Sequence, residues 1–84
     1  MEMYQELTDS IEVIALFEQG TLRPCRFRWR GKVHKVTRIT SDWQSSAGEI
    51  RLRYFAVIDS VADCFQLCYD EGNCNWTLAK IWVE

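Results

Sequence analysis

An alternation of apolar and charged residues over positions 25–36 constrains the fold of this chain more than any other feature. Three apolar residues, the last of them Trp29, alternate with three arginines, and Gly31 follows. A period of two places successive side chains on opposite faces of a β-strand. Glycine adopts the positive φ angle that a tight hairpin turn requires. The pattern predicts a β-hairpin with a two-residue loop at Arg30-Gly31.

This loop fixes the register of the predicted hairpin. Phe27 then faces His34, and Cys25, Phe27, His34 and Val36 form an inner face. The outer face carries the charged residues, with Arg26 opposite Lys35. Val36 and Ile39 have opposite parity, so we expect a bulge near Thr37-Arg38.

The remaining chain reads as further short strands divided by turn signals. Residues 11–18 alternate and contain the β-branched cluster Ile11-Val13-Ile14, which favours a strand over a rival helix across 4–18. Residues 1–9 are expected to be a frayed end or a short helix. Residues 41–49 are rich in Ser, Asp and Gly and predict a long loop. Strands are expected over 50–59, 64–70 and 75–84, the last two flanking a turn at 70–73.

These elements predict one all-β domain over residues 1–84. The expected architecture is a small SH3-like or split barrel of five to six antiparallel strands with meander connections, because closure removes exposed sheet edges. A hydrophobic fraction of 48% with four tryptophans can form a small core. The chain has no apolar run near 18 residues and no secretory signal, so we expect no membrane span and a cytoplasmic location.

The four cysteines do not form a recognisable metal pattern. Disulfides would require a secreted context, which the sequence does not indicate. Cys64 and Cys68 have the spacing of half a zinc site, but Cys25 and Cys74 supply no second pair. We expect reduced thiols, no metal and no cofactor; zinc bound by Cys64, Cys68 and Cys74 is the alternative.

Catalytic motifs are equally sparse. The sequence has no Gly-rich phosphate loop and no recognisable Ser-His-Asp set. His34 is the single histidine, and its position opposite Phe27 predicts a packed ring. A pair of His34 with Cys25 or Cys64 is conceivable but has no cue for an activated thiol. We therefore expect a protein that is not an enzyme.

Charge is distributed unevenly along the chain. Residues 1–18 contain five acids and no base, whereas residues 19–41 contain seven bases and no acid. The net charge is −2, so any attraction to phosphate must be local. Alternate arginines on a strand lie about 6.6–6.8 Å apart, close to the phosphate repeat of an extended single strand. The candidate nucleic-acid-binding residues are Arg26, Arg28, Arg30, Lys32, Lys35, Arg38 and Trp43.

A solvated strand face is the alternative interpretation of this basic row. Its arginines would then pair with acids of the N-terminal strand, such as Glu12 and Glu18. Trp43 likewise has two interpretations: an exposed ring that stacks on a base, or a core plug at the end of a loop.

The motif Pro24-x-x-Phe27-x-Trp29-Arg30-Gly31-x-x-His34-x-Val36 resembles that of a bacterial family of small β domains of unknown function. Later elements, including Phe65-x-Leu67-x-Tyr69-Asp70 and Trp76-x-Leu78, are also similar. Relatives often have an aromatic residue where this chain has His34, and some are appended to translesion-type DNA polymerases. The resemblance implies an all-β fold and a DNA-repair setting, and it carries over no catalytic residue.

The sequence thus predicts a non-enzymatic binding module. Its partner is expected to be single-stranded or duplex nucleic acid bound at the basic hairpin. The alternative is a protein-interaction or self-association module, a monomer or weak homodimer that uses the hairpin against an acidic partner. Such a module could also use a last strand that is apolar on both faces, with Ile81 and Val83 on the second face.

Overall fold

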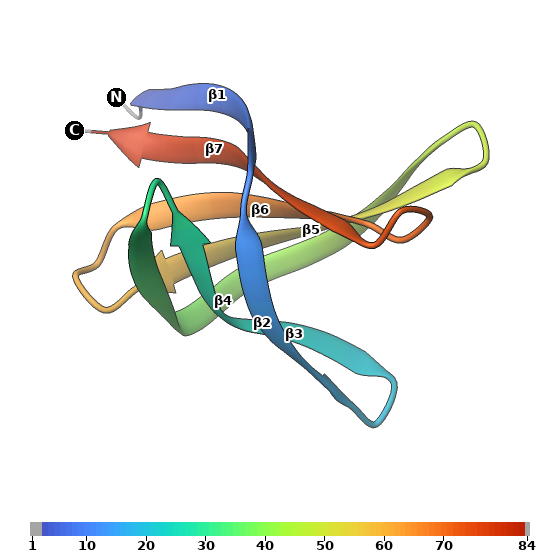
Figure 1. Cartoon of the computed structure of the whole chain (residues 1–84), viewed down its shortest axis with the longest axis horizontal. Helices are drawn as coiled ribbons and strands as arrows, with labels where there is room; N and C mark the ends of the chain where they lie inside the picture. Colours follow the sequence, from blue (N-terminus) through green and yellow to red (C-terminus); the bar gives the residue numbers. More distant parts are fainter. Residues whose placement is uncertain (1–2, 84) are drawn as a thin grey trace.

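The described residues form antiparallel β-strands joined by short turns. The computed structural model describes residues 3–83 (Figure 1). Its strands are β1 (Met3–Ser10), β2 (Glu12–Glu18), β3 (Thr21–Trp29), β4 (Lys32–Ala47), β5 (Ile50–Asp59), β6 (Cys64–Asp70) and β7 (Asn75–Val83). Within residues 3–83 there is no helix that could span a membrane.

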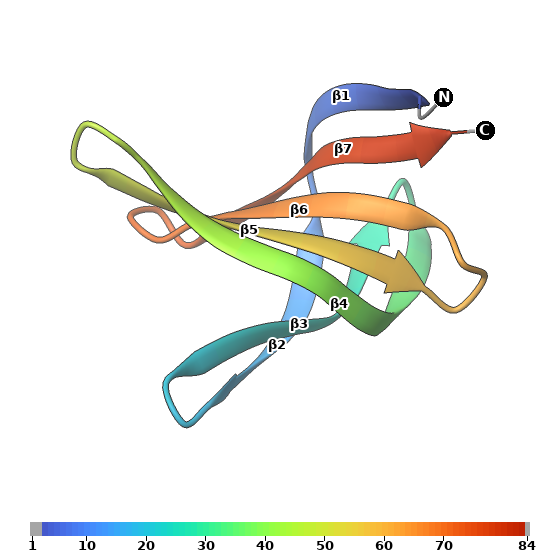
Figure 2. The ribbon, with the colours of Figure 1, turned by 180° about the vertical axis from the view of Figure 1, so that it is seen from behind.

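The strands form one sheet in the order β1-β7-β6-β5-β4-β3-β2. Every neighbouring pair is consecutive along the chain except β1 and β7. The long strand β4 bends, so that its first residues pair with β3 and residues from Val36 onward pair with β5 (Figure 2). The two edge strands, β1 and β2, are separated along the chain by Ile11 alone.

The core lies on the concave side of this bent sheet. Phe27, Phe55 and Leu67 are almost completely buried. The rings of Phe27 and Phe65 pack edge to face, with their centroids 5.1 Å apart. The buried apolar cluster combines residues from β3, β5, β6 and β7 with Ile11. One apolar cluster drawn from strands along the chain is what holds so small a domain together.

The predicted all-β class is confirmed, but the predicted count of five to six strands is wrong. The seventh strand is β1, which replaces the expected frayed end or short helix over 1–9; residues 1 and 2 lie outside the described part of the chain. Pairing with β7 decides the conformation of this segment, and Tyr4 packs against Trp82 with ring centroids 6.1 Å apart. The rival helix over 4–18 is therefore also wrong.

The long loop predicted over 41–49 is also wrong. Strand β4 continues through these polar residues to Ala47, which pairs with Ile50, and the turn is confined to Gly48 and its neighbour. Gly48 has a φ angle of 65°, as a tight turn requires. Residues 41–51, which form the β4–β5 arm, are all exposed. Because the pairing of β5 with β6 ends at Leu52, only the outer part of this arm, residues 46–51, is a two-stranded ribbon.

Bulges modify the simple alternation of side chains. The bulge predicted near Thr37 is confirmed by a register shift between Val36 and Arg38. A second shift, at Cys25, turns Pro24 into the core and leaves Cys25 half-buried, so Cys25 does not share the buried face of Phe27 as predicted.

A third bulge, at Ala79, changes the parity of the last strand. Leu78 pairs with Leu67, whereas Lys80 pairs with Gln66. Ile81 consequently packs on the core with Leu78, and the predicted second apolar face of this strand is wrong for Ile81. The side chain of Val83 lies outside the described part of the structure.

Candidate functional site

The β3–β4 hairpin forms with the predicted register. Phe27 pairs with His34 and Arg26 pairs with Lys35. Arg30 and Gly31 have φ angles of 51° and 78°, the positive values of a two-residue turn that matches the twist of the strands. The hairpin therefore presents the rings of Phe27 and His34 to the core and its basic residues to solvent.

The acidic strand β2 covers part of this basic surface. Glu12 lies opposite Arg28, and their charged groups are 3.6 Å apart. Glu18 lies 3.3 Å from Arg23, whose partner across the ladder is Leu16. These side chains are all more than half exposed, and exposed ion pairs contribute only about 0–1 kcal/mol each to stability. An anionic ligand could therefore replace Glu12 beside Arg28 at little cost.

Arg26 and Lys35 have no such acidic partner. They face one another across the strand pair, both are exposed, and within residues 3–83 no carboxylate forms an ion pair with either. Ile14 is the neighbour of Arg26 on β2. Like charges directly opposite each other destabilise a sheet. This pair is therefore an unneutralised cationic site in the middle of the outer face.

The seven predicted contact residues do not form one surface. The outer face of the β2–β3–β4 unit carries Arg26, Arg28 and Lys35. Arg30 lies in the turn and Lys32 is the first residue of β4, and both line a cavity described below. Arg38 follows the bulge and pairs with Ile58. All six basic residues are exposed.

Trp43 lies apart from the hairpin on the β4–β5 arm. It is 40% exposed and stacks on Tyr54 with ring centroids 5.4 Å apart and an interplanar angle of 11°. Trp43 is thus an exposed ring rather than a core plug. Its partner directly across the ladder is Tyr54, which holds the indole flat against the arm.

Apolar side chains share the outer face with the cations. Ile14 is 63% exposed, Val33 is 52% exposed and Leu16 is 44% exposed. In the register of the sheet, Val33 lies beside Arg28 and Ile14 beside Arg26. The outer face therefore combines positive charge with exposed aliphatic groups, although scattered surface residues of this type are common.

A buried histidine–carboxylate pair lies behind the hairpin. The ring of His34 stacks on Phe27 at 4.9 Å, and its Nδ1 lies 3.0 Å from Oδ2 of Asp59. Oδ1 of Asp59 accepts hydrogen bonds from the backbone N–H groups of Val61 and Asp63. Burial acts to raise the pKa of Asp59, but the hydrogen bonds from His34 and the two backbone groups outweigh it and lower the pKa. His34 is a packed ring, as predicted, and the sequence analysis missed its partner Asp59.

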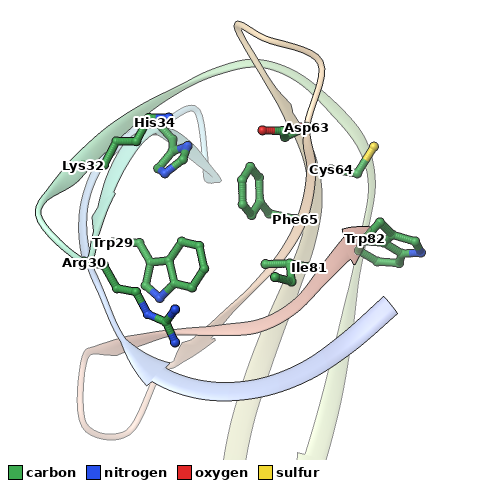
Figure 3. Close-up of a pocket in the computed structure, with 9 residues that line it drawn as sticks. All are labelled: Trp29, Arg30, Lys32, His34, Asp63, Cys64, Phe65, Ile81 and Trp82. Atoms are coloured by element: carbon green, nitrogen blue, oxygen red, sulfur yellow. The ribbon is translucent and has the colours of Figure 1, made fainter. Parts of the chain in front are cut away.

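A cavity of about 370 Å³ opens beside this pair, between the hairpin turn and strands β6 and β7. Figure 3 shows the side chains of Trp29, His34, Phe65 and Ile81 directed into it. The thiol of Cys64 lies on the other side of β6, as expected for a neighbour of Phe65 on a strand (Figure 3). The cavity therefore does not bring a thiol to the imidazole.

Asp9 fixes one wall of the cavity. Its Oδ2 accepts a hydrogen bond of 2.8 Å from Nε1 of Trp29 and lies 3.5 Å from the guanidinium of Arg30. The Arg30 guanidinium in turn sits 4.6 Å from the centre of the Trp29 ring. This cluster was not predicted from the sequence, because Asp9 lies in the segment expected to be a frayed end or a short helix.

The cysteines do not converge. Cys25, Cys64, Cys68 and Cys74 are all free, and within residues 3–83 no three His, Cys, Asp or Glu side chains are grouped as metal ligands. Burial raises the pKa of the Cys68 thiol, which disfavours the thiolate that metals and electrophiles require.

Comparisons with known proteins give no relative to guide the assignment. No protein-family model matches the chain. No curated protein sequence and no solved structure matches it either.

Proposed function

We propose that the protein is a cytoplasmic, non-enzymatic module that binds nucleic acid through the outer face of the β2–β3–β4 unit. The observation that supports this most directly is the unneutralised pair of Arg26 and Lys35. Two cations placed opposite each other cost stability, and a bound phosphate would convert this repulsion into attraction.

The geometry of the outer face suits an extended phosphate backbone. Arg26 and Arg28 project from alternate positions of β3, about 6.6–6.8 Å apart along the strand. Lys35 adds a third cation beside Arg26 from β4. Phosphate neutralisation by these groups carries little base readout, so binding would be strongly salt-dependent and weakly sequence-dependent.

The same proposal includes closure of the sheet into a small SH3-like or split barrel. In support, β1 and β2 are nearly continuous in the chain, yet β1 pairs with β7 and β2 with β3. The backbone N–H of Ile11, between them, donates a hydrogen bond to the carbonyl of Trp76 in β7. A closed arrangement would hold the β2–β3–β4 face rigid against its ligand.

Fluorescence anisotropy with labelled single-stranded DNA, duplex DNA and RNA tests the proposal. With three phosphate contacts to a single strand, the logarithm of the binding constant should fall with the logarithm of the salt concentration with a slope of about −2. Affinity should therefore fall about 20-fold between about 50 and 200 mM salt. Arg26→Glu should weaken binding at least 10-fold. Arg51→Glu, an equal charge change on the exposed β4–β5 arm, is the matched control. Equal loss in both variants, or no binding at low salt, would refute the proposed surface.

A second candidate function is self-association or binding of an acidic protein through the same face. The exposed Ile14, Leu16 and Val33 among the cations favour it. Sedimentation velocity at micromolar concentration distinguishes the two functions: a dimer that Ile14→Lys dissociates supports self-association, whereas a monomer that binds nucleic acid supports the leading proposal.

A further inference from the structure

The cavity at the β3–β4 turn has the features of a small-ligand site, separate from the outer face. Its volume of about 370 Å³ lies in the range of sites for small molecules, which are about 300–1,000 Å³. Residues of four strands and one turn meet there: the end of β3, the start of β4, the start of β6, the end of β7 and Arg30 of the β3–β4 turn.

The walls of the cavity are mainly apolar, with two aromatic rings in an edge-to-face arrangement. The rings of Trp29 and Phe65 lie 6.5 Å apart at 72°, and Ile81 adds an aliphatic wall (Figure 3). Asp9 holds the indole of Trp29 in place through the bond to Nε1. A preformed aromatic wall of this type favours a planar ligand.

His34 supplies an unsatisfied polar atom to this apolar space. Its side chain is 6% exposed, and among residues 3–83 its Nε2 finds no hydrogen-bond partner. Nδ1 is matched with the carboxylate of Asp59, which stays ionised because its pKa is lowered. In the tautomer that donates from Nδ1 to Asp59, Nε2 is an acceptor that calls for an N–H donor.

The rim of the cavity carries both signs of charge. Lys32 is exposed and, within residues 3–83, has no ion-pair partner, whereas Arg30 is held by Asp9. Asp63 lies across the cavity from Lys32 and His34 (Figure 3). A ligand that fits would present N–H donors to His34 and Asp63 and an anionic group to Lys32.

We propose that this cavity binds a nucleoside monophosphate unit whose base bears an amino group. The base packs against Trp29 and Phe65 and donates from its amino group to Nε2 of His34 and to Asp63, while the phosphate reaches Lys32. A uracil base fits less well, because its carbonyl oxygens would face these two acceptors. The unit is either a free nucleotide or the phosphorylated end of a strand.

The single histidine allows a direct test by long-range ¹⁵N–¹H NMR of the imidazole. Adenosine 5′-monophosphate should shift the Nε2 resonance of His34 with a Kd of about 1 mM or tighter. Uridine 5′-monophosphate, adenosine and ribose 5-phosphate should each bind at least about 3-fold more weakly, since each lacks one of the contacts. A shift by a 5′-phosphorylated trinucleotide alone would identify a strand end as the source of the unit.

Two lysines of the same hairpin separate this site from the outer face. Lys32→Ala should raise the Kd for adenosine 5′-monophosphate about 3- to 10-fold without changing that for adenosine. Lys35→Ala, on the outer face, should leave both values unchanged, although it weakens nucleic-acid binding under the proposed function. The inference does not rest on the proposed function, because Lys32→Ala can weaken mononucleotide binding whether or not Lys35→Ala weakens nucleic-acid binding.

Three results would overturn the inference. The first is an unshifted Nε2 resonance with about 5 mM adenosine 5′-monophosphate and with the phosphorylated trinucleotide. The second is binding of ribose 5-phosphate as tight as that of adenosine 5′-monophosphate. The third is an equal effect of Lys32→Ala and Lys35→Ala on the mononucleotide.

Discussion

At the scale of single residues, Asp59 shows how a buried charge is retained in so small a core. The carboxylate is 4% exposed, yet His34 and two backbone N–H groups together satisfy both of its oxygens. A buried charge without such partners would be neutralised instead. Asp59 thereby fixes both the turn after β5 and the ring orientation of His34.

Asp59 gives the protein a specific sensitivity to acid. Its folded pKa lies below the ordinary value of 3.8, so its stabilising effect is complete above that value and is lost as the pH falls through the folded pKa. Asp59→Asn should cost about 1–3 kcal/mol at pH 7, because the amide cannot accept the same bonds. Urea unfolding should show this difference shrinking towards pH 3. Asp42→Asn, on the exposed arm, should not change the free energy of unfolding at either pH. If the cost of Asp59→Asn were the same at pH 7 and pH 3, the ionised Asp59 carboxylate would not be the source of the stabilisation.

Cys68 predicts the opposite behaviour in alkali. Burial, partly offset by hydrogen bonding with Tyr54 and Thr77, raises the pKa of its thiol above the ordinary value of 9.0. The unfolded chain therefore releases this proton first, and stability falls as the pH rises beyond about 9. Thermal melts at pH 7 and pH 10 should show a smaller alkaline loss for Cys68→Ala than for the unmodified protein. Cys64→Ala, at a half-buried thiol, is the control, and its loss of stability between pH 7 and pH 10 should equal that of the unmodified protein.

At the scale of elements, the β3–β4 hairpin depends on its turn. Gly31 has a φ angle of 78°, and a Cβ placed there would meet nothing within 4 Å, so a substitution there acts through the backbone alone. Gly31→Ala should destabilise the protein by about 1–2 kcal/mol in chemical denaturation. Gly72→Ala is the comparison, because Gly72 has no positive φ angle and a Cβ there would displace only the Asp70 carboxylate, 3.3 Å away, by a small amount. An equal cost at both glycines would show that the turn is not under conformational constraint.

The hairpin register could be predicted from the sequence, and the β4–β5 arm could not. Strict alternation and one glycine leave a single register that buries Phe27 and His34 together. Residues 41–47 carry the polar side chains of a loop, and only the partner strand β5 makes them a strand. Local composition contains no information about that partner.

Bulges explain most of the other differences between the strand faces predicted from the sequence and those in the structure. The one near Thr37 left a trace in the opposite parity of Val36 and Ile39, so it was predictable. The bulges at Cys25 and Ala79 left none, because apolar residues occur at both parities around them. Only part of the candidate site could be predicted. The row of basic residues is visible in the sequence, but the fact that some face the outer surface and others line the cavity depends on the geometry of the β3–β4 turn.

At the scale of the whole molecule, Ile11 connects the two edges of the sheet. It is 8% exposed, joins β1 to β2 and donates its N–H to the carbonyl of Trp76. Ile11→Ala should cost about 2–4 kcal/mol through the lost contacts and the space left behind. Ile14→Ala, three residues away but 63% exposed, should cost less than about 0.5 kcal/mol. Similar denaturation midpoints for these two variants would contradict the central position of Ile11.

The pairing of β1 with β7 also has a kinetic consequence. All other strand pairs join neighbours along the chain, so they close short loops and can assemble early as successive hairpins. The β1–β7 ladder joins Met3 to Val83 and must wait for nearly the whole chain to be in place. Amide hydrogens of β1 should therefore exchange with solvent before those of β5 and β6, which makes β1 the part of the protein that opens first and folds last.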